Sequence, residues 1–189
     1  TYTIGGNGGT SSTFAATKFF AGGVIATVPL GQADMGPTLV AVNPTTNRIY
    51  ATNESKSGVL SSGSVSVIDG RANSSLATLL LNASPGYLAV NPITNRIYVD
   101  TPIEGTVTVL DGATNTIVAT TTVGNGPRGI AVNPTTNRIY VANTSDNTVS
   151  VINGATNSVL SAITVGYEPS DVAVNPTTNR IYVANYGDK

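Results

Sequence analysis

One segment, Asn-Pro-x-Thr-Asn-Arg-Ile-Tyr, occurs four times and constrains the fold more than any other feature of the chain. Its copies begin at Asn43, Asn91, Asn133 and Asn175. The interval is 42 residues from 91 to 133 and again from 133 to 175, and 48 residues from 43 to 91. A fixed period in the low forties is that of one β-propeller blade, a sheet of four strands. We therefore predict an all-β propeller without helices.

Each period divides into four expected strands. In the third copy these are the apolar run 130–132, then 138–141, the alternating segment 149–151 and finally 159–165. The innermost strands place four small residues at equivalent positions, Ala41, Ala89, Ala131 and Ala173. The repeat predicts three whole blades at about 38–82, 87–123 and 129–165.

Turn residues separate the expected strands. Proline in Asn-Pro-x-Thr-Asn fits the second position of a type I turn. The pairs Asp69-Gly70 and Asp111-Gly112 predict tight hairpin turns after the third strand. Arg48 and Arg96 begin the second strand beside these aspartates, which predicts cross-strand ion pairs.

The two ends of the chain each carry half a blade. Only one strand, 180–185, follows the last Asn-Pro segment. Residues 24–31 align with 159–166, a fourth strand, and a gapless count places 13–17 on a third strand, with Lys18 opposite Arg180. Because unpaired strand edges aggregate, we expect the halves to pair. Pairing within the chain closes a four-bladed ring with one composite blade, and this is the arrangement we favour.

Two other arrangements remain open. Pairing between chains gives a closed dimer or an open fibre, and the chain could also be a piece of a longer propeller. We divide the chain into residues 1–23, a Gly-rich arm with one candidate strand, and residues 24–189, the propeller repeats.

The segments Tyr140-Val141-Ala142-Asn143 and Tyr182-Val183-Ala184-Asn185 resemble the Tyr-Val-Thr-Asn (YVTN-type) repeat of β-propellers. Residues 50–53 and 98–101 are looser versions, and the resemblance covers about residues 24–186. This repeat is familiar from surface-layer-like and other extracellular proteins, so the resemblance implies an extracellular or cell-surface location. It brings no catalytic motif, because propellers host many unrelated functions.

Composition excludes several kinds of site. The 189 residues include no Cys and no His, which removes disulfides, thiolate metal sites and the commonest general base. Charged residues make up 10% and the net charge is −1, so no basic field is available for nucleic acid. No apolar run approaches the ~20 residues of a membrane helix. We expect no metal, no cofactor and no membrane span.

Few residues stand out as candidates for a site. The tyrosines at 50, 98, 140 and 182 recur with the period, which favours packing between blades over a stacking surface for sugars. Three tyrosines outside this ladder fall in the blade connections and are our candidates for contact with a glycan or a partner: Tyr87, Tyr167 and Tyr186. Asp100 departs from the Ala or Thr of its repeat position and Glu104 is near it, so any functional carboxylate is expected there.

Four N-glycosylation sequons suit a secreted protein, and we expect them in turns or at loop ends: Asn53, Asn73, Asn82 and Asn143.

We interpret the chain as a non-enzymatic structural or adhesive protein of the cell surface, a candidate subunit of a self-assembling fibre or layer. It would associate with itself through its N-terminal segment and its edge strands. The alternative is a propeller module that binds a glycan or peptide, including one on a cell-surface protein. A lactonase-like hydrolase is less favoured, because catalysis needs different residues converging on one point and these repeats are nearly identical.

Overall fold

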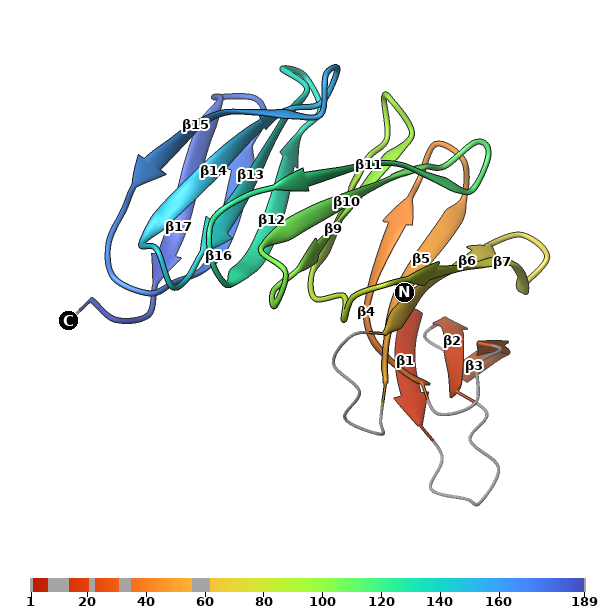
Figure 1. Cartoon of the computed structure of the whole chain (residues 1–189). Coiled ribbons are helices and arrows are strands. Elements are labelled where there is room, and N and C mark those ends of the chain that lie inside the picture. The colour runs from red at the N-terminus through yellow and green to blue at the C-terminus, as the bar shows by residue number, and fades with distance from the viewer. Residues whose placement is uncertain (1, 7–13, 21–22, 31–34, 56–61, 189) are drawn as a thin grey trace. The chain divides into compact units, whose positions relative to one another are not determined.

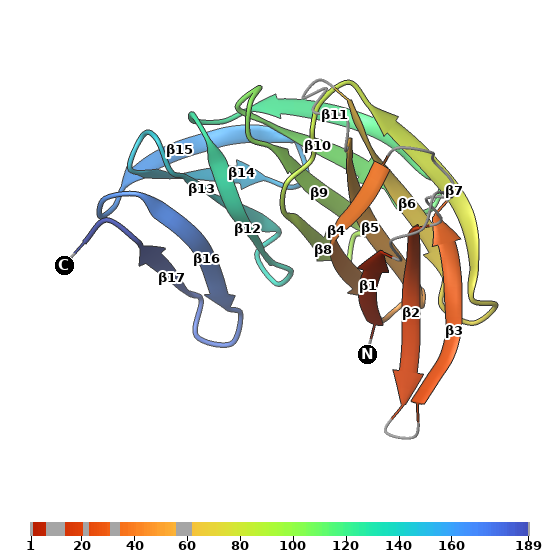
Figure 2. The ribbon, with the colours of Figure 1, turned by 90° about the horizontal axis from the view of Figure 1, so that it is seen from below.

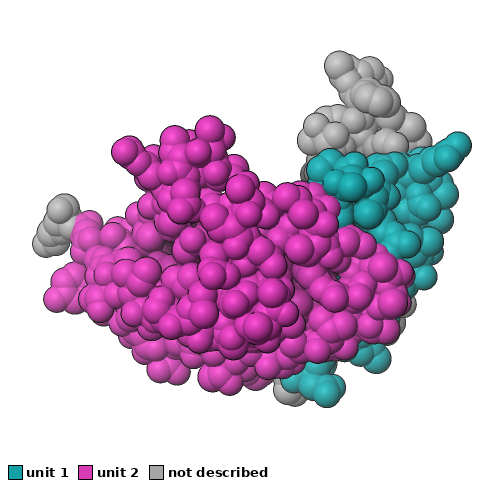
Figure 3. Space-filling view, turned by 90° about the horizontal axis from the view of Figure 1, so that it is seen from above, with its two compact units in different colours: residues 1–85 teal, residues 86–189 magenta. Residues whose placement is uncertain are grey.

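The computed structural model consists of β-strands and the turns that connect them. The residues it describes are 2–6, 14–20, 23–30, 35–55 and 62–188. None of them belongs to a helix, and hence the described part of the chain has no helix able to cross a membrane. The chain divides into two compact units, residues 1–85 (unit 1) and 86–189 (unit 2), coloured separately in Figure 3.

Unit 1 contains two antiparallel sheets (Figure 1). The first has the order β1-β2-β3 and the second β4-β5-β6-β7. Their strands are β1 Tyr2–Gly6, β2 Phe14–Phe20, β3 Gly23–Leu30, β4 Met35–Asn43, β5 Arg48–Ser55, β6 Gly63–Asp69 and β7 Ser74–Leu81. Val28 and Leu30 of β3 are buried with Ile49, Ala51 and Ile68 of the second sheet, so one apolar core joins the two sheets.

Unit 2 contains two four-stranded sheets, β8 to β11 and β12 to β15, and the two-stranded sheet β16-β17. Their strands are β8 Leu88–Asn91, β9 Arg96–Thr101, β10 Thr106–Asp111, β11 Thr116–Thr122, β12 Pro127–Asn133, β13 Arg138–Asn143, β14 Thr148–Asn153, β15 Ser158–Thr164, β16 Pro169–Asn175 and β17 Arg180–Asn185. Strand β12 contacts β8 on one side and β16 on the other, so the first strands of successive blades lie side by side (Figure 2).

Apolar side chains between neighbouring sheets form the core of unit 2. Tyr98 and Val109 of one blade pack with Ile139 and Ile152 of the next, and all four are buried. The predicted propeller blades are confirmed: each whole blade is a four-stranded antiparallel sheet that begins and ends within about three residues of the expected bounds. The alanine positions are also equivalent, since each lies opposite the ladder tyrosine of its own blade.

The repeated Asn-Pro segment is a turn that its two asparagines shape. Oδ1 of Asn133 accepts hydrogen bonds from the backbone N–H groups of Thr135 (3.1 Å) and Thr136 (3.3 Å). Asn137 ends the turn with a φ of 51°, a conformation that Asn tolerates better than most residues. Nδ2 of Asn133 also donates to Oδ1 of Asn179 in the following turn, 2.8 Å away. The motif therefore both closes each hairpin and ties it to the next.

The Asp-Gly pairs begin hairpin turns after the third strand, as predicted, but each turn is four residues long. The N–H of Asn73 donates to the carbonyl of Asp69 at 2.8 Å, and Asn73 rather than the glycine has the positive φ, 54°. Gly70 is required for a different reason, because a Cβ there would lie 2.7 Å from the carbonyl oxygen of Asn47. The neighbouring prediction holds: Arg96 forms an ion pair with Asp111.

Within unit 1, strand β2 has β1 on one edge and β3 on the other. Within unit 2, β17 pairs with β16 alone among the described residues. The composite blade that would close a four-bladed ring stays a prediction. The proposed division of the chain at residue 23 stays a prediction.

Candidate binding site

An open hollow at one end of the blades of unit 2 is the candidate site. It has a volume of about 690 Å³. It lies where the first strands of three successive blades begin, at β8, β12 and β16, and where the second strands β13 and β17 end. Its lining residues are Tyr87, Arg128, Thr144, Glu168, Ser170, Asp171 and Tyr186.

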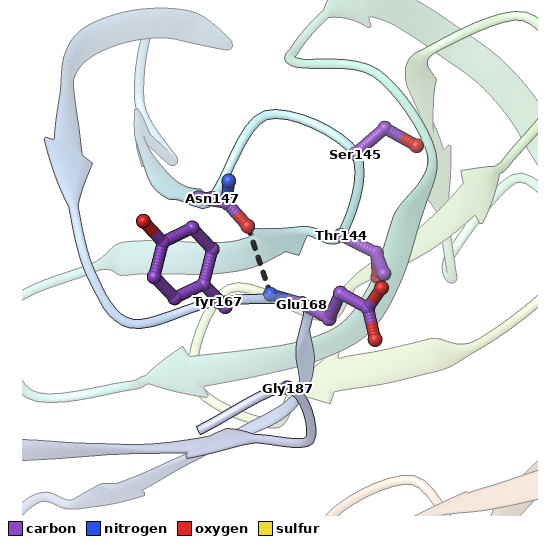
Figure 4. Close-up of a pocket in the computed structure, with 6 residues that line it drawn as sticks. All are labelled: Thr144, Ser145, Asn147, Tyr167, Glu168 and Gly187. Carbon is purple, nitrogen blue, oxygen red and sulfur yellow. Dashed lines mark hydrogen bonds between the residues drawn. The ribbon is translucent and has the colours of Figure 1, made fainter. Parts of the chain in front are cut away.

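The connection between β15 and β16 forms one wall of the hollow. Glu168 adopts a φ of 50°, and its N–H donates to Oδ1 of Asn147 at 2.8 Å (Figure 4). Its carbonyl accepts the N–H of Tyr186 at 3.0 Å. These two bonds fix the wall to the β13–β14 turn and to the end of β17.

Strands β12 and β16 approach closely beside the hollow. Gly129 of β12 has a φ of 79°, and a Cβ on it would lie 2.7 Å from the Cα of Asp171 on β16. Only glycine permits both the conformation and the approach. The hydroxyl of Thr144 donates to the carbonyl of Pro169 at 2.7 Å and joins the same two blades at the rim.

A second hollow of about 550 Å³ adjoins the first and shares Thr144 and Glu168 with it. Tyr167 lines this second hollow, and Figure 4 shows its ring beside Asn147 while Glu168 points to the other side, towards Thr144. The N–H of Tyr167 donates to Oδ1 of Asp188 at 3.0 Å, which holds the loop in place.

The structure brings together the three loop tyrosines that the sequence singled out. Tyr87 and Tyr186 line one hollow and Tyr167 lines the adjoining one. Tyr167 and Tyr186 are 68% and 81% exposed, so their rings are available to a ligand. Packing between blades holds for three of the four ladder tyrosines, since Tyr50, Tyr98 and Tyr140 are at most 8% exposed, whereas Tyr182 is 55% exposed.

The hollow also contains residues that the sequence analysis missed, namely Arg128, Glu168 and Asp171. When the blades are aligned on their equivalent alanines, Arg128 corresponds to Gly86 and Ser170, and Gly129 to Tyr87 and Asp171. The blades thus differ at this edge, while their turns and inner strands repeat almost unchanged. That departure from the repeat was a usable signal in the sequence.

Asp100 lies beneath the hollow and does not line it. Its side chain is fully buried, and its Oδ1 accepts the N–H of Tyr87 at 2.7 Å. Oδ2 has no hydrogen-bond partner among the described residues. Burial raises the pKa of this carboxyl to about 8, although hydrogen bonds from the N–H groups of Tyr87 and Gly86 oppose the shift. Asp100 therefore supports the backbone that carries Tyr87.

Glu104 and the sequons are spread over the blades. Glu104 is exposed in the turn between β9 and β10 and does not line the hollow. Asn53 lies within β5 and Asn143 ends β13; both are buried, and both amides donate to hydroxyls of the next strand. Asn82 is exposed and Asn73 half-buried. Of the four, Asn82 alone is exposed, because Oδ1 of Asn73 is also buried.

No group of three or more acidic residues in the described ranges is arranged to hold a metal ion.

Comparisons with known proteins support the propeller fold. A family model described as the NHL repeat matches residues 125–152, from the start of β12 into β14. No curated protein matches the chain. A functionally unknown protein from Desulfotomaculum acetoxidans DSM 771 has a similar crystal structure, with a TM-score of 0.74, 18% identity, and coverage of 93% of this chain and 58% of that one.

Hydrazine synthase of Kuenenia stuttgartiensis is also similar in structure, with a TM-score of 0.72, 21% identity, and coverage of 90% of this chain and 47% of that one. The chain thus spans about half the length of the structures that it matches. At this level of identity the likeness concerns the fold alone.

Proposed function

We propose that the chain is a non-enzymatic recognition module that works outside the cell or on its surface, as the resemblance to YVTN-type repeats suggests. The hollow of unit 2 would bind a short polar segment of another surface molecule, a peptide or a glycan. The observation that carries this proposal is the gathering of Tyr87 and Tyr186 with Arg128, Glu168 and Asp171 at the one edge where the blades differ.

The lining suits a ligand with flat apolar faces and polar groups. Tyrosine rings stack on such faces at a small cost in conformational entropy and offer a hydroxyl at the rim. Arg128 can donate to a carboxylate or a hydroxyl, while Glu168 and Asp171 can accept from hydroxyl or amide groups. All three charged side chains are open to water, so their contacts with a ligand would contribute more to specificity than to affinity. The aromatic rings would supply most of the affinity.

The raised pKa of the Asp100 carboxyl, about 8, is of the kind found in acid catalysts. Its complete burial argues against this role, because a general acid must reach the proton that it transfers. Asp100 accepts a hydrogen bond from the backbone N–H of Tyr87, which indicates a structural role.

Binding of the purified chain to immobilised peptides and oligosaccharides tests this proposal. Tyr186→Ala should weaken binding at least tenfold, since truncating an aromatic anchor costs about 2 kcal/mol. Tyr182→Ala is the matched control, because Tyr182 is 55% exposed on β17 and does not line the hollow. Equal effects of the two variants would refute the site. A loss with Arg128→Ala on peptides alone would identify a peptide carboxylate as the ligand group.

A second candidate function is that of a structural subunit in an extracellular assembly. The observation that favours it is the outer edge of β17, which has no ladder partner among the described residues. Open strand edges pair readily with strands of other chains.

A further inference from the structure

We propose that Glu168 makes the hollow of unit 2 selective for a cation, the side-chain ammonium of a lysine in a peptide. This inference rests on the proposed function, because it names the ligand class of the same hollow. The backbone of Glu168, the position of its carboxylate and the charges around it all favour this ligand.

Glu168 has a backbone conformation that its side chain disfavours. Its φ of 50° is in the left-handed region, and every other non-glycine residue with a positive φ in the described ranges is an asparagine. Glycine and asparagine adopt this region readily, whereas in other residues Cβ lies too close to the following carbonyl oxygen. Strained residues of this kind are concentrated at binding and active sites. The conformation therefore points to a use for the Glu168 side chain.

The other blades show that folding does not require a glutamate at this position. When the blades are aligned on their equivalent alanines, Gly36, Ser84 and Gly126 correspond to Glu168, and a proline follows each of them. Gly126 has a similar φ of 61°. The preceding blade thus builds the same connection with a glycine, which is not strained there. A glutamate in its place lowers stability and adds a carboxylate, so we attribute its presence to what the carboxylate binds.

The backbone of Glu168 is held in place while its carboxylate is open to a ligand. The N–H of Glu168 donates to Oδ1 of Asn147 at 2.8 Å, and its carbonyl accepts the N–H of Tyr186 at 3.0 Å. The side chain is exposed and points towards Thr144 (Figure 4). Its carboxylate has no hydrogen bond or ion pair with another described residue. A carboxylate on a fixed backbone loses little conformational freedom when it binds a cation.

The charges of the hollow favour a cationic ligand group. Glu168 and Asp171 supply two carboxylates against the one guanidinium of Arg128, and all three side chains are exposed. Arg128 forms no ion pair with either carboxylate. The ring of Tyr87 lines the same hollow, and tyrosine rings attract an ammonium group. A lysine side chain brings an apolar stem for the ring and an ammonium for the carboxylate.

A peptide fits this hollow better than a sugar because the hollow presents both signs of charge. Arg128 remains available for a carboxylate, and its planar guanidinium can bind both carboxylate oxygens. Peptides can carry carboxylates beside their lysines. A neutral oligosaccharide offers neither charge, and a polymer of amino sugars offers only the ammonium. We therefore infer a peptide segment that contains a lysine and an acidic residue close to it.

NMR titration of the full chain tests the ligand class. The probes are the peptide Gly-Lys-Gly-Asp-Gly, the same peptide with an acetylated and therefore uncharged lysine, maltotriose as a neutral sugar, and a glucosamine trimer. The lysine peptide should bind at least about tenfold more tightly than its acetylated form, since hydrogen bonds between charged groups are among the strong ones. Glu168→Gln should abolish this difference. Glu104→Gln, an exposed carboxyl that does not line the hollow, is the matched control and should bind as the wild type does.

Urea unfolding gives a readout that does not depend on the ligand. Glu168→Gly should raise the midpoint, because glycine adopts a φ of 50° without strain, while Glu168→Gln keeps the Cβ and should leave the midpoint unchanged. Both variants should bind the lysine peptide at least about tenfold more weakly. An unchanged midpoint in the glycine variant overturns the inference, and so does a raised midpoint with unchanged peptide binding.

The four probes distinguish failure of this inference from failure of the proposed function. Equal or tighter binding of the acetylated peptide or of maltotriose would refute selection of a cation and leave the hollow as a binding site. Tighter binding of the glucosamine trimer than of the lysine peptide would overturn the peptide as the ligand. If no probe shifts the resonances of the residues that line the hollow, both proposals are refuted.

Discussion

The buried carboxyl of Asp100 makes the stability of unit 2 depend on pH near neutrality, and Asp100→Asn should remove this dependence. Burial raises the pKa of Asp100 to about 8, against a value of about 3.9 in an unfolded chain. Between these values the folded state holds a proton that the unfolded state has lost. The free energy of unfolding must therefore fall as pH rises from about 4 to 8 and then level off.

The raised pKa of Asp100 sets the size of this pH dependence. Each pH unit between about 4 and 8 lowers the free energy of unfolding by at most about 1.4 kcal/mol. The free energy of unfolding should therefore fall by about 3 kcal/mol from pH 5 to pH 8. No histidine is present to titrate in the same range. Asp69, Asp111 and Asp146 have lowered pKa values, chiefly because backbone N–H groups donate to their carboxylates, so their contribution changes only at lower pH.

Urea unfolding followed by far-ultraviolet circular dichroism at pH 5, 6, 7, 8 and 9 measures the dependence. Asparagine has nearly the same shape, keeps an oxygen for the Tyr87 N–H and cannot ionise, so the variant should give a nearly flat profile. Glu104→Gln, an exposed carboxyl in the next turn, is the matched control and should keep the wild-type slope. A flat wild-type profile, or an unchanged slope in Asp100→Asn, would refute the reasoning.

Three further substitutions in unit 2 test the packing, each through the midpoint of urea unfolding. Gly129→Ala should cost about 1–3 kcal/mol and weaken ligand binding, because the φ of 79° and the 2.7 Å approach to Asp171 both exclude a Cβ; an unchanged midpoint would contradict the close approach. Ala131→Leu should cost about 1–3 kcal/mol through overpacking of the half-buried inner strand, whereas a stabilised variant would show free space there. Asn143→Ala should cost about 1–3 kcal/mol, because two hydroxyls of β14 lose their donor, while Asn143→Ser should recover part of the loss.

The fold of each blade could be predicted from the sequence because its signals are local. Alternating apolar residues define the strands, and the Asn-Pro segment defines a turn whose side-chain bonds span only two or three positions. The hairpin turns after Asp69 and Asp111 lie where they were predicted, but they are four residues long and their geometry depends on a contact that is not local. Gly70 leaves room for the carbonyl of Asn47, 23 residues earlier in the chain.

The candidate site likewise has one part that the sequence predicts and one part that only the stacked sheets reveal. Tyr87, Tyr167 and Tyr186 could be selected from the sequence as aromatic residues outside the periodic ladder. That Tyr87 and Tyr186 line one hollow, although 99 positions separate them, depends on how successive sheets stack. Arg128 and Asp171 could have been noticed as departures from the repeat, but only the stacked strands reveal that they share this hollow.

The sequence by itself determined the blade, its four strands and their pairing, because a repeated pattern of apolar residues and turns acts over a few positions at a time. The tertiary structure decided what surrounds each strand. The identical strands β13 and β17 demonstrate the difference: five of the six residues are buried between two neighbouring strands in β13, whereas none of the six is buried in β17, which has a neighbour on one side among the described residues. A residue's side chain fixes what it can pair with, but strands distant in sequence determine whether a partner is present.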